Sequence, residues 1–157
     1  MVPTLTFWEE LLRILVAAGL GAALGLEREL RGQQAGLRTH LLVAVGSALF
    51  TLVGAYGFEE FYSAGPRGNP VDPTRIAAQI VTGIGFLGAG AILRQGTIVR
   101  GLTTAATLWV VAAIGLAAGA GYYGGAVATT IVVLLALGPG RWLSRRFVRP
   151  YRPGDEP

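Results

Sequence analysis

The stretch that decides the fold is "TGIGFLGAGAIL", Thr82–Leu93, which contains the spacing G-x-G-x-x-G at Gly83, Gly85 and Gly88. In a dinucleotide-binding loop, such glycines follow a strand, open a helix and precede an acidic residue by about 20 positions. Here they lie inside a long apolar run, and no carboxylate follows before Asp155. We therefore interpret them as helix-packing residues rather than as a phosphate site.

The composition around this stretch indicates a chain surrounded mostly by lipid. Its 157 residues, enough for one domain, are 52% hydrophobic and 14% charged, with a mean hydropathy of +0.54, whereas soluble domains average about 25% charged residues. The chain has no Cys, which excludes disulfides and thiolate metal sites. The chain has no Lys, and all its arginines except Arg13 lie between or beside apolar runs, which indicates membrane topology; no nucleic-acid partner is expected.

Five apolar runs predict five transmembrane helices. With their flanks they reach the roughly 20 residues that cross a ~30 Å hydrocarbon core, and they lack the alternation of barrel strands. The runs are Leu11–Leu26 (extendable back to Phe7), Leu41–Tyr56, Ile76–Leu93, Leu102–Ala120 and Tyr122–Leu137. The predicted fold class is all-α, a polytopic membrane helix bundle at 1–140 followed by an arginine-rich cytoplasmic tail at 141–157. Because Glu9 and Glu10 precede the first run instead of basic residues, we expect an uncleaved span there.

The arginines predict the orientation of the bundle. The segments after the first and third runs and the tail are rich in arginine, whereas the segment 57–72 holds only Arg67 and the connection between the fourth and fifth runs holds none. Because cytoplasmic loops carry the excess of basic residues, the N-terminus is expected outside and the C-terminus inside.

The glycines predict where helices pack closely, since small residues let membrane helices approach one another. The first run offers Gly21 and Gly25, and the fourth offers Gly115 and Gly119. The third run has the most, with Gly83, Gly85, Gly88 and Gly90. We expect the third helix to be the central and most closely packed one, with local unwinding around an ion site as the alternative.

Polar residues at the start of the third run form a stripe at helical spacing: Asp72, Arg75 and Gln79. Polar groups at membrane depth are functional candidates. Asp72 also suits a helix N-cap before Pro73, so it serves as a cap, as a functional group, or as both. An ion pair between Asp72 and Arg13 is a further expectation, with snorkelling of Arg13 as the alternative.

Glu27 is the deepest carboxylate at the inner end of the first run. We expect it to pair with Arg38 or Arg100, in an ionic layer that also includes Arg28, His40 and Arg94. A hydrated Mg²⁺ held by Asp72 or by Glu27 stays open as the metal alternative, and no other cofactor is expected. One His without Cys does not supply a structural zinc site.

Two long stretches resemble the MgtC/SapB family of bacterial membrane proteins. They are "GLERELRGQQAGLRTHLLVAVGSALF" and "DPTRIAAQIVTGIGFLGAGAILRQGTIVRGLTTAATLW", and the resemblance extends over about Leu11 to Leu137. It implies a multi-pass protein of the bacterial inner membrane, associated with magnesium limitation and, in pathogens, with survival in macrophages. Glu27 and Asp72 match the family's acidic hallmarks, and Arg28, Arg38, Arg75 and Arg100 lie in the matching motifs.

The resemblance also implies a function. Family members are linked to inhibition of the F-type ATP synthase, which makes that enzyme an expected partner. We expect the short SapB-type architecture, so roles that depend on a further soluble domain are not expected to apply. The expected function is a non-enzymatic regulator or accessory protein of magnesium homeostasis that acts through intramembrane helix contacts. The alternative is a small oligomeric Mg²⁺ or proton transporter, and the glycine faces permit a homo-oligomer.

Overall fold

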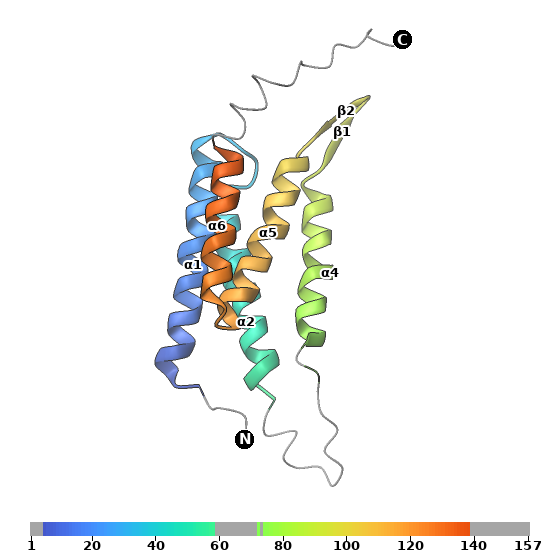
Figure 1. The fold of residues 1–157 in the computed structure, drawn as a ribbon. Helices are drawn as coiled ribbons and strands as arrows, with labels where there is room; N and C mark the ends of the chain where they lie inside the picture. The colour runs from blue at the N-terminus through green and yellow to red at the C-terminus, as the bar shows by residue number, and fades with distance from the viewer. Residues whose placement is uncertain (1–4, 59–71, 73, 139–157) are drawn as a thin grey trace.

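A computed structural model describes residues 5–58, 72 and 74–138 of the chain. Most of these residues are helical, as predicted, and they form an elongated bundle with one small β-hairpin (Figure 1). The elements in chain order are α1 (Phe7–Leu30), α2 (Leu37–Tyr56), α4 (Thr74–Gly90), β1 (Leu93–Gln95), β2 (Ile98–Arg100), α5 (Leu102–Gly119) and α6 (Tyr123–Leu137).

The helices α1 and α2 form an antiparallel hairpin whose turn is fixed by one carboxylate. Gly32, with φ 63°, lets the chain leave α1. The Leu37 backbone N–H at the start of α2 then donates to the Glu29 carboxylate at 2.8 Å. This bond satisfies one of the free N–H groups at a helix start. The turn thereby places the first residues of α2 against the end of α1.

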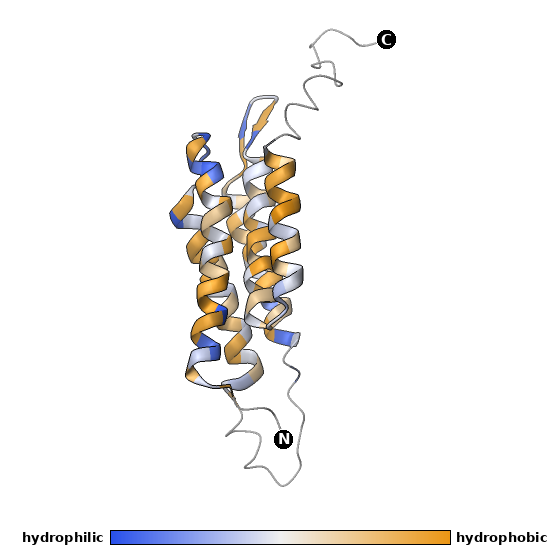
Figure 2. Ribbon diagram, turned by 60° about the vertical axis from the view of Figure 1, so that its left-hand side comes forward, coloured by the Kyte–Doolittle hydropathy of each residue, from blue (hydrophilic) through white to orange (hydrophobic). Residues whose placement is uncertain are grey.

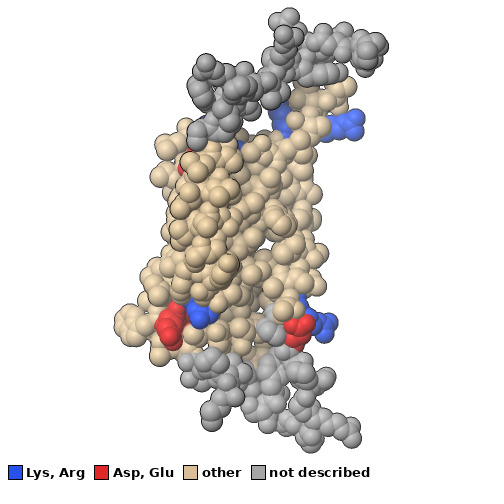
Figure 3. All heavy atoms as spheres, viewed as in Figure 1, with Lys and Arg blue, Asp and Glu red and all other residues tan. Residues whose placement is uncertain are grey.

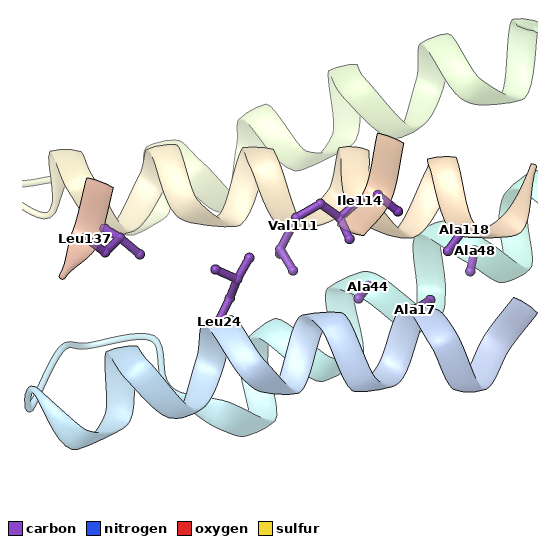
Figure 4. Close-up of a cluster of buried hydrophobic side chains, with 9 residues drawn as sticks. Ala17, Leu24, Ala44, Ala48, Val111, Ile114, Ala118 and Leu137 are labelled. Carbon is purple, nitrogen blue, oxygen red and sulfur yellow. The ribbon is translucent and has the colours of Figure 1, made fainter. Parts of the chain in front are cut away.

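The core of the bundle lies between α1, α2, α5 and α6. Its residues are mostly small, such as Ala17, Ala44 and Ala118, each fully buried. Figure 4 shows Leu24 of α1 and Val111 of α5 directed toward one another in the same cluster. Because small residues dominate, the helix backbones approach closely and dispersion contacts are dense.

Four of the predicted packing glycines lie at the closest of these approaches. A Cβ atom built on Gly21 would lie 2.6 Å from the Cβ of Ala44, and one on Gly25 would lie 2.7 Å from the Cα of Leu37. On α5, a Cβ at Gly119 would lie 2.6 Å from the Ala48 carbonyl oxygen, and one at Gly115 would collide with the carbonyl oxygen of Ala44. The α1–α2 and α2–α5 contacts therefore exclude side chains at these positions.

The expectation that the third apolar run is the central helix is wrong. In α4, the helix of that run, only Ile84 and Gly88 are buried, and it lies at the edge of the bundle (Figure 1). Its contacts are mainly with α5 and α2, whereas α5 contacts all four other helices. Cβ atoms at Gly83, Gly85 and Gly90 would meet no heavy atom within 4 Å. The large number of glycines in the third run did not indicate a central helix, because burial depends on which face of the helix the glycines occupy. In α5, by contrast, buried small residues occur throughout the helix.

Leu93, the last residue of the third run, and the connection that follows it form a β-hairpin rather than further helix. α4 ends at Gly90, and β1 pairs antiparallel with β2 in the register Leu93↔Arg100, Arg94↔Val99 and Gln95↔Ile98. Gly96, with φ 61°, occupies the turn. All six strand residues are exposed, so the hairpin projects from the bundle.

Two described helices, α2 and α5, are long and apolar enough to cross a membrane. Charged side chains gather at the two ends of the bundle and leave an uncharged band between them (Figure 3). Figure 2 shows the same distribution along the ribbon, with hydrophilic residues concentrated toward the helix ends. Large apolar side chains are exposed on the band, including Leu15, Leu49, Trp109 and Val132. This surface is typical of a protein in contact with hydrocarbon.

Candidate functional site

The predicted polar stripe lies on the outward face of α4. We define the α4 stripe as Asp72, Arg75, Gln79, Gly83 and Phe86, five residues that share one side of the helix at a spacing of three or four. All five are exposed. The helical spacing predicted from the sequence is present, but the stripe faces away from the core of the described bundle.

The Asp72 side chain caps the start of α4. Its Oδ1 accepts hydrogen bonds from the Thr74 hydroxyl at 2.6 Å and from the Thr74 backbone N–H at 2.9 Å. These bonds, first that of the hydroxyl, hold the pKa of Asp72 below its usual value, and the Arg75 charge lowers the pKa further. The carboxylate is therefore ionised at neutral pH, and the capping role is present in the structure.

Gln79 stands between the polar start of the stripe and its apolar continuation. It forms no hydrogen bond with another described residue. With Gly83 it lines one side of a groove of about 690 Å³ between α2 and α4, opposite Phe50 and Val53. The groove walls are almost entirely apolar, so the Gln79 amide is the main polar group that borders it.

Arg13 joins the ends of three helices instead of pairing with Asp72. Its Nη1 donates to the Gly119 carbonyl oxygen at 2.8 Å, and its guanidinium lies 5.7 Å from the Tyr56 ring centroid. The last carbonyls of a helix lack partners within the helix, and a guanidinium can satisfy one of them. That requirement at the end of α5 explains why the expected Arg13–Asp72 pair does not form. Arg13 and Gly119 are 106 positions apart, so no local pattern in the sequence revealed this contact.

The opposite end of the bundle, at the top of Figure 1, buries two basic side chains. Arg28 is 1% exposed, and its Nη2 donates to Gln33 Oε1 at 2.7 Å. His40 is fully buried, with its Nδ1 2.9 Å from the Gly36 carbonyl oxygen. By contrast, the other predicted members of the ionic layer, Arg38, Arg94 and Arg100, are exposed.

Glu27 pairs with residues of its own helix. Its carboxylate forms ion pairs with Arg31, one turn further along α1, and with Arg28 at 3.8 Å. The expectation of a bond to Arg38 or Arg100 is wrong, because the i,i+4 neighbour already lies within reach. Two guanidinium groups beside Glu27 also oppose the binding of a cation there.

The two carboxylates considered for a metal belong to opposite ends of the bundle. Asp72 precedes α4 at the lower end of Figure 1, and Glu27 follows the apolar part of α1 at the upper end. Within the part of the chain that the structure describes, no three His, Asp or Glu side chains are grouped to hold an ion. Of the two carboxylates, Asp72 is the one that forms no ion pair with an arginine among the described residues.

Comparisons with known proteins place these features in a family. The model of the MgtC family matches residues 14–146. The protein named "Putative magnesium transporter YhiD" of Escherichia coli (strain K12) is 49% identical over 129 residues, which cover 82% of this chain and 59% of that protein. "Protein MgtC" of Salmonella typhimurium is 50% identical over 126 residues, covering 80% of this chain and 50% of that protein.

An uncharacterized protein of Synechocystis is similar to the same extent, with 48% identity over 128 residues and coverage of 82% of this chain and 50% of its own. The chain thus spans between half and three fifths of the length of these curated relatives. No solved structure matches the chain.

Proposed function

The chain belongs to the MgtC family, and from that premise we propose that it is a non-enzymatic protein of the bacterial inner membrane that serves magnesium homeostasis through helix contacts with a partner. A magnesium-related role is supported by the names of the relatives, MgtC and putative magnesium transporter YhiD. Those relatives are longer than this chain, which spans 59% and 50% of their lengths.

In the proposed arrangement all five helices span the membrane, with the upper end of Figure 1 in the cytoplasm. Two observations support it. The uncharged band lies between two charged ends (Figure 3). The described arginines are also unequally divided, because Arg13 and Arg75 lie at the lower end and the other five lie at the upper end: Arg28, Arg31, Arg38, Arg94 and Arg100. Basic residues are enriched on the cytoplasmic side.

The observation that carries the proposal is the outward direction of the α4 stripe. A transport path within one chain requires polar side chains directed into the bundle. In the described interior, the buried polar groups between the charged ends are hydroxyls, and those of Thr107 and Thr130 donate to carbonyls of their own helices. An outward polar stripe on a peripheral helix is suited instead to contact with another membrane protein. The F-type ATP synthase, expected from the resemblance, is one candidate for that partner.

A small oligomeric Mg²⁺ or proton transporter is the second candidate, favoured by the printed name of the E. coli relative. In that case the path would run between copies of the chain, along Asp72, Arg75 and Gln79, because these residues are exposed.

Ion flux in liposomes separates the two. Purified protein is reconstituted, and Mg²⁺ and proton entry are followed with enclosed dyes. We expect no flux above that of protein-free liposomes, together with recovery of a membrane partner when the protein is purified from native membranes. Flux that Asp72→Asn abolishes and that the exposed control Glu10→Gln leaves intact would establish the transporter and overturn our proposal.

A further inference from the structure

We propose that the partner seated on the α4 stripe is a second copy of this chain, in a dimer with a two-fold axis along the membrane normal. This inference rests on the proposed function, since it identifies one partner of the same surface. Three properties of the stripe support it: an unpaired amide, two complementary charges, and a shape that admits another helix.

The first property is the amide of Gln79. It is exposed, lies about 8 Å along the helix from Thr74, and makes no hydrogen bond with a described residue. In hydrocarbon an unpaired amide is costly, and lipid tails offer neither a donor nor an acceptor. Around a two-fold axis, each Gln79 amide donates to the carbonyl of the other and accepts from its NH₂ group. A second copy therefore supplies what lipid does not.

The second property is the charge at the start of the stripe. Asp72 and Arg75 lie on the same exposed face and form no ion pair with each other. Two copies inserted in the same direction hold these residues at the same depth, so Asp72 of each copy faces Arg75 of the other. The pairing occurs twice by symmetry and is lost if the copies are antiparallel. Charge complementarity thus favours a second copy of this chain in a parallel arrangement.

The third property is the shape of the face. One turn beyond Gln79, Gly83 has no heavy atom within 4 Å of the position of a Cβ, so a second helix can approach the backbone. Phe86, one further turn along, is 82% exposed, the highest value among the large apolar side chains described. The groove between α2 and α4 opens beside Gly83. It offers the Phe86 ring of the second copy an apolar site next to Phe50.

Disulfide cross-linking tests the geometry, and the chain is suited to it because it contains no Cys. Phe86→Cys is reconstituted in liposomes and exposed to a mild oxidant. The matched control is Val132→Cys on α6, which is 64% exposed in the same uncharged band. We expect the disulfide-linked dimer to be the main product for Phe86→Cys and a minor product for Val132→Cys. Equal yields from the two positions, or no dimer from Phe86→Cys, would overturn the proposed interface.

Energy transfer between labelled copies tests whether the other stripe residues stabilise the dimer, without altering Phe86. Labels are placed on Ser144→Cys, and the dimer dissociation constant is measured against the protein-to-lipid ratio. Gln79→Leu and Arg75→Glu should each raise this constant about tenfold, as expected for the loss of about 1.4 kcal/mol, and Gly83→Leu should raise it more. Arg94→Glu, a charge reversal on the exposed hairpin, should leave it unchanged. A constant that none of the three stripe variants changes, or a monomer at every ratio, would refute the dimer.

The dimer and the proposed function fail independently. Association is measured without an ion gradient, and flux is measured on the same liposomes afterwards. A protein that stays monomeric and shows no ion flux would refute the dimer interface and leave the regulator proposal in place. A dimer that conducts Mg²⁺ would support the interface and refute the regulator proposal. A cross-link from Phe86→Cys to a different protein in native membranes, with a monomer in liposomes, would assign the stripe to that protein and refute self-association.

Discussion

Arg13 shows how one side chain couples the ends of three helices. It extends from α1, donates to the last carbonyl of α5 at Gly119 and lies beside Tyr56 at the end of α2. These contacts hold the ends of α1, α2 and α5 together at the lower end of the bundle. At this scale the informative residues are therefore those whose side chains hydrogen-bond to backbone groups at helix ends, as Arg13 and Asp72 do.

Replacing Arg13 by Met should destabilise the bundle. The substitution keeps much of the apolar stem but removes the guanidinium, so the Gly119 carbonyl loses a charged hydrogen-bond donor. We expect a loss of about 1–3 kcal/mol in the free energy of unfolding. Unfolding in mixed micelles, followed by circular dichroism, measures the change. Glu10→Gln, on the same helix but exposed, is the control; an equal effect of both substitutions would show that the Gly119 contact contributes nothing.

Thr74→Ala should raise the pKa of Asp72. The variant removes the hydroxyl that makes the first contribution to lowering this pKa, while the backbone N–H of residue 74 stays in place. Because the folded pKa lies below the ordinary value of 3.8, the cap stabilises α4 above that pH and is lost as the pH falls through the folded pKa. Thr74→Ala should move this loss to higher pH.

The carboxyl carbon resonance of Asp72 gives the titration midpoint directly. Thr82→Ala is the matched control, because its hydroxyl bonds to Ala78 of the same helix and does not contact Asp72. A midpoint that is the same in the wild type and in Thr74→Ala would refute the capping interaction.

At the scale of the elements, the helices could be predicted and their neighbours could not. The five apolar runs correspond to the five described helices, since hydropathy depends on local composition. The end of the third run was misread because Leu93 is apolar yet belongs to an exposed hairpin. The position of α4 at the edge was also missed, since packing depends on which face meets another helix.

The same reasoning applies to the candidate site. The stripe of Asp72, Arg75 and Gln79 followed from helical spacing alone, but its outward direction required the arrangement of α2, α4 and α5. The partner of Glu27 is Arg31, one turn away in sequence, and the i,i+4 spacing of the two residues was enough to indicate it.

Two glycine substitutions should separate tight from open helix faces. Gly115→Ala places a Cβ against the Ala44 carbonyl oxygen, which belongs to a helix backbone and does not move alone. We expect a loss of about 2 kcal/mol or more in the free energy of unfolding. Gly85→Ala meets nothing within 4 Å and should be neutral or stabilise by up to about 1 kcal/mol through helix propensity. Unfolding in mixed micelles measures both, and equal effects would contradict the α2–α5 contact.

At the scale of the whole molecule, the proposed five spans have unequal lengths. α5 has 18 residues and α2 has 20, whereas α4 has 17 and α6 has 15. At 1.5 Å per residue the shortest helix is about 22 Å long, less than a ~30 Å hydrocarbon core. A short span is accommodated by local thinning of the bilayer or by contacts with neighbouring helices. The α5–α6 contact provides such a neighbour for α6.

Accessibility of single cysteines tests the arrangement as a whole. Glu10→Cys lies in the first turn of α1 at the lower end, and Gln95→Cys lies on the hairpin at the upper end; both positions are exposed. Since the upper end holds five of the seven described arginines, it should face the cytoplasm. A membrane-impermeant maleimide added to intact cells depleted of their outer membrane should therefore label Glu10→Cys and leave Gln95→Cys unlabelled until the membrane is permeabilised. The reverse labelling pattern would show that the protein has the opposite orientation. It would also reverse the side from which a partner or an ion reaches Asp72. Labelling of both positions in intact cells would show that the bundle does not separate two compartments, and the five-span arrangement would then be wrong.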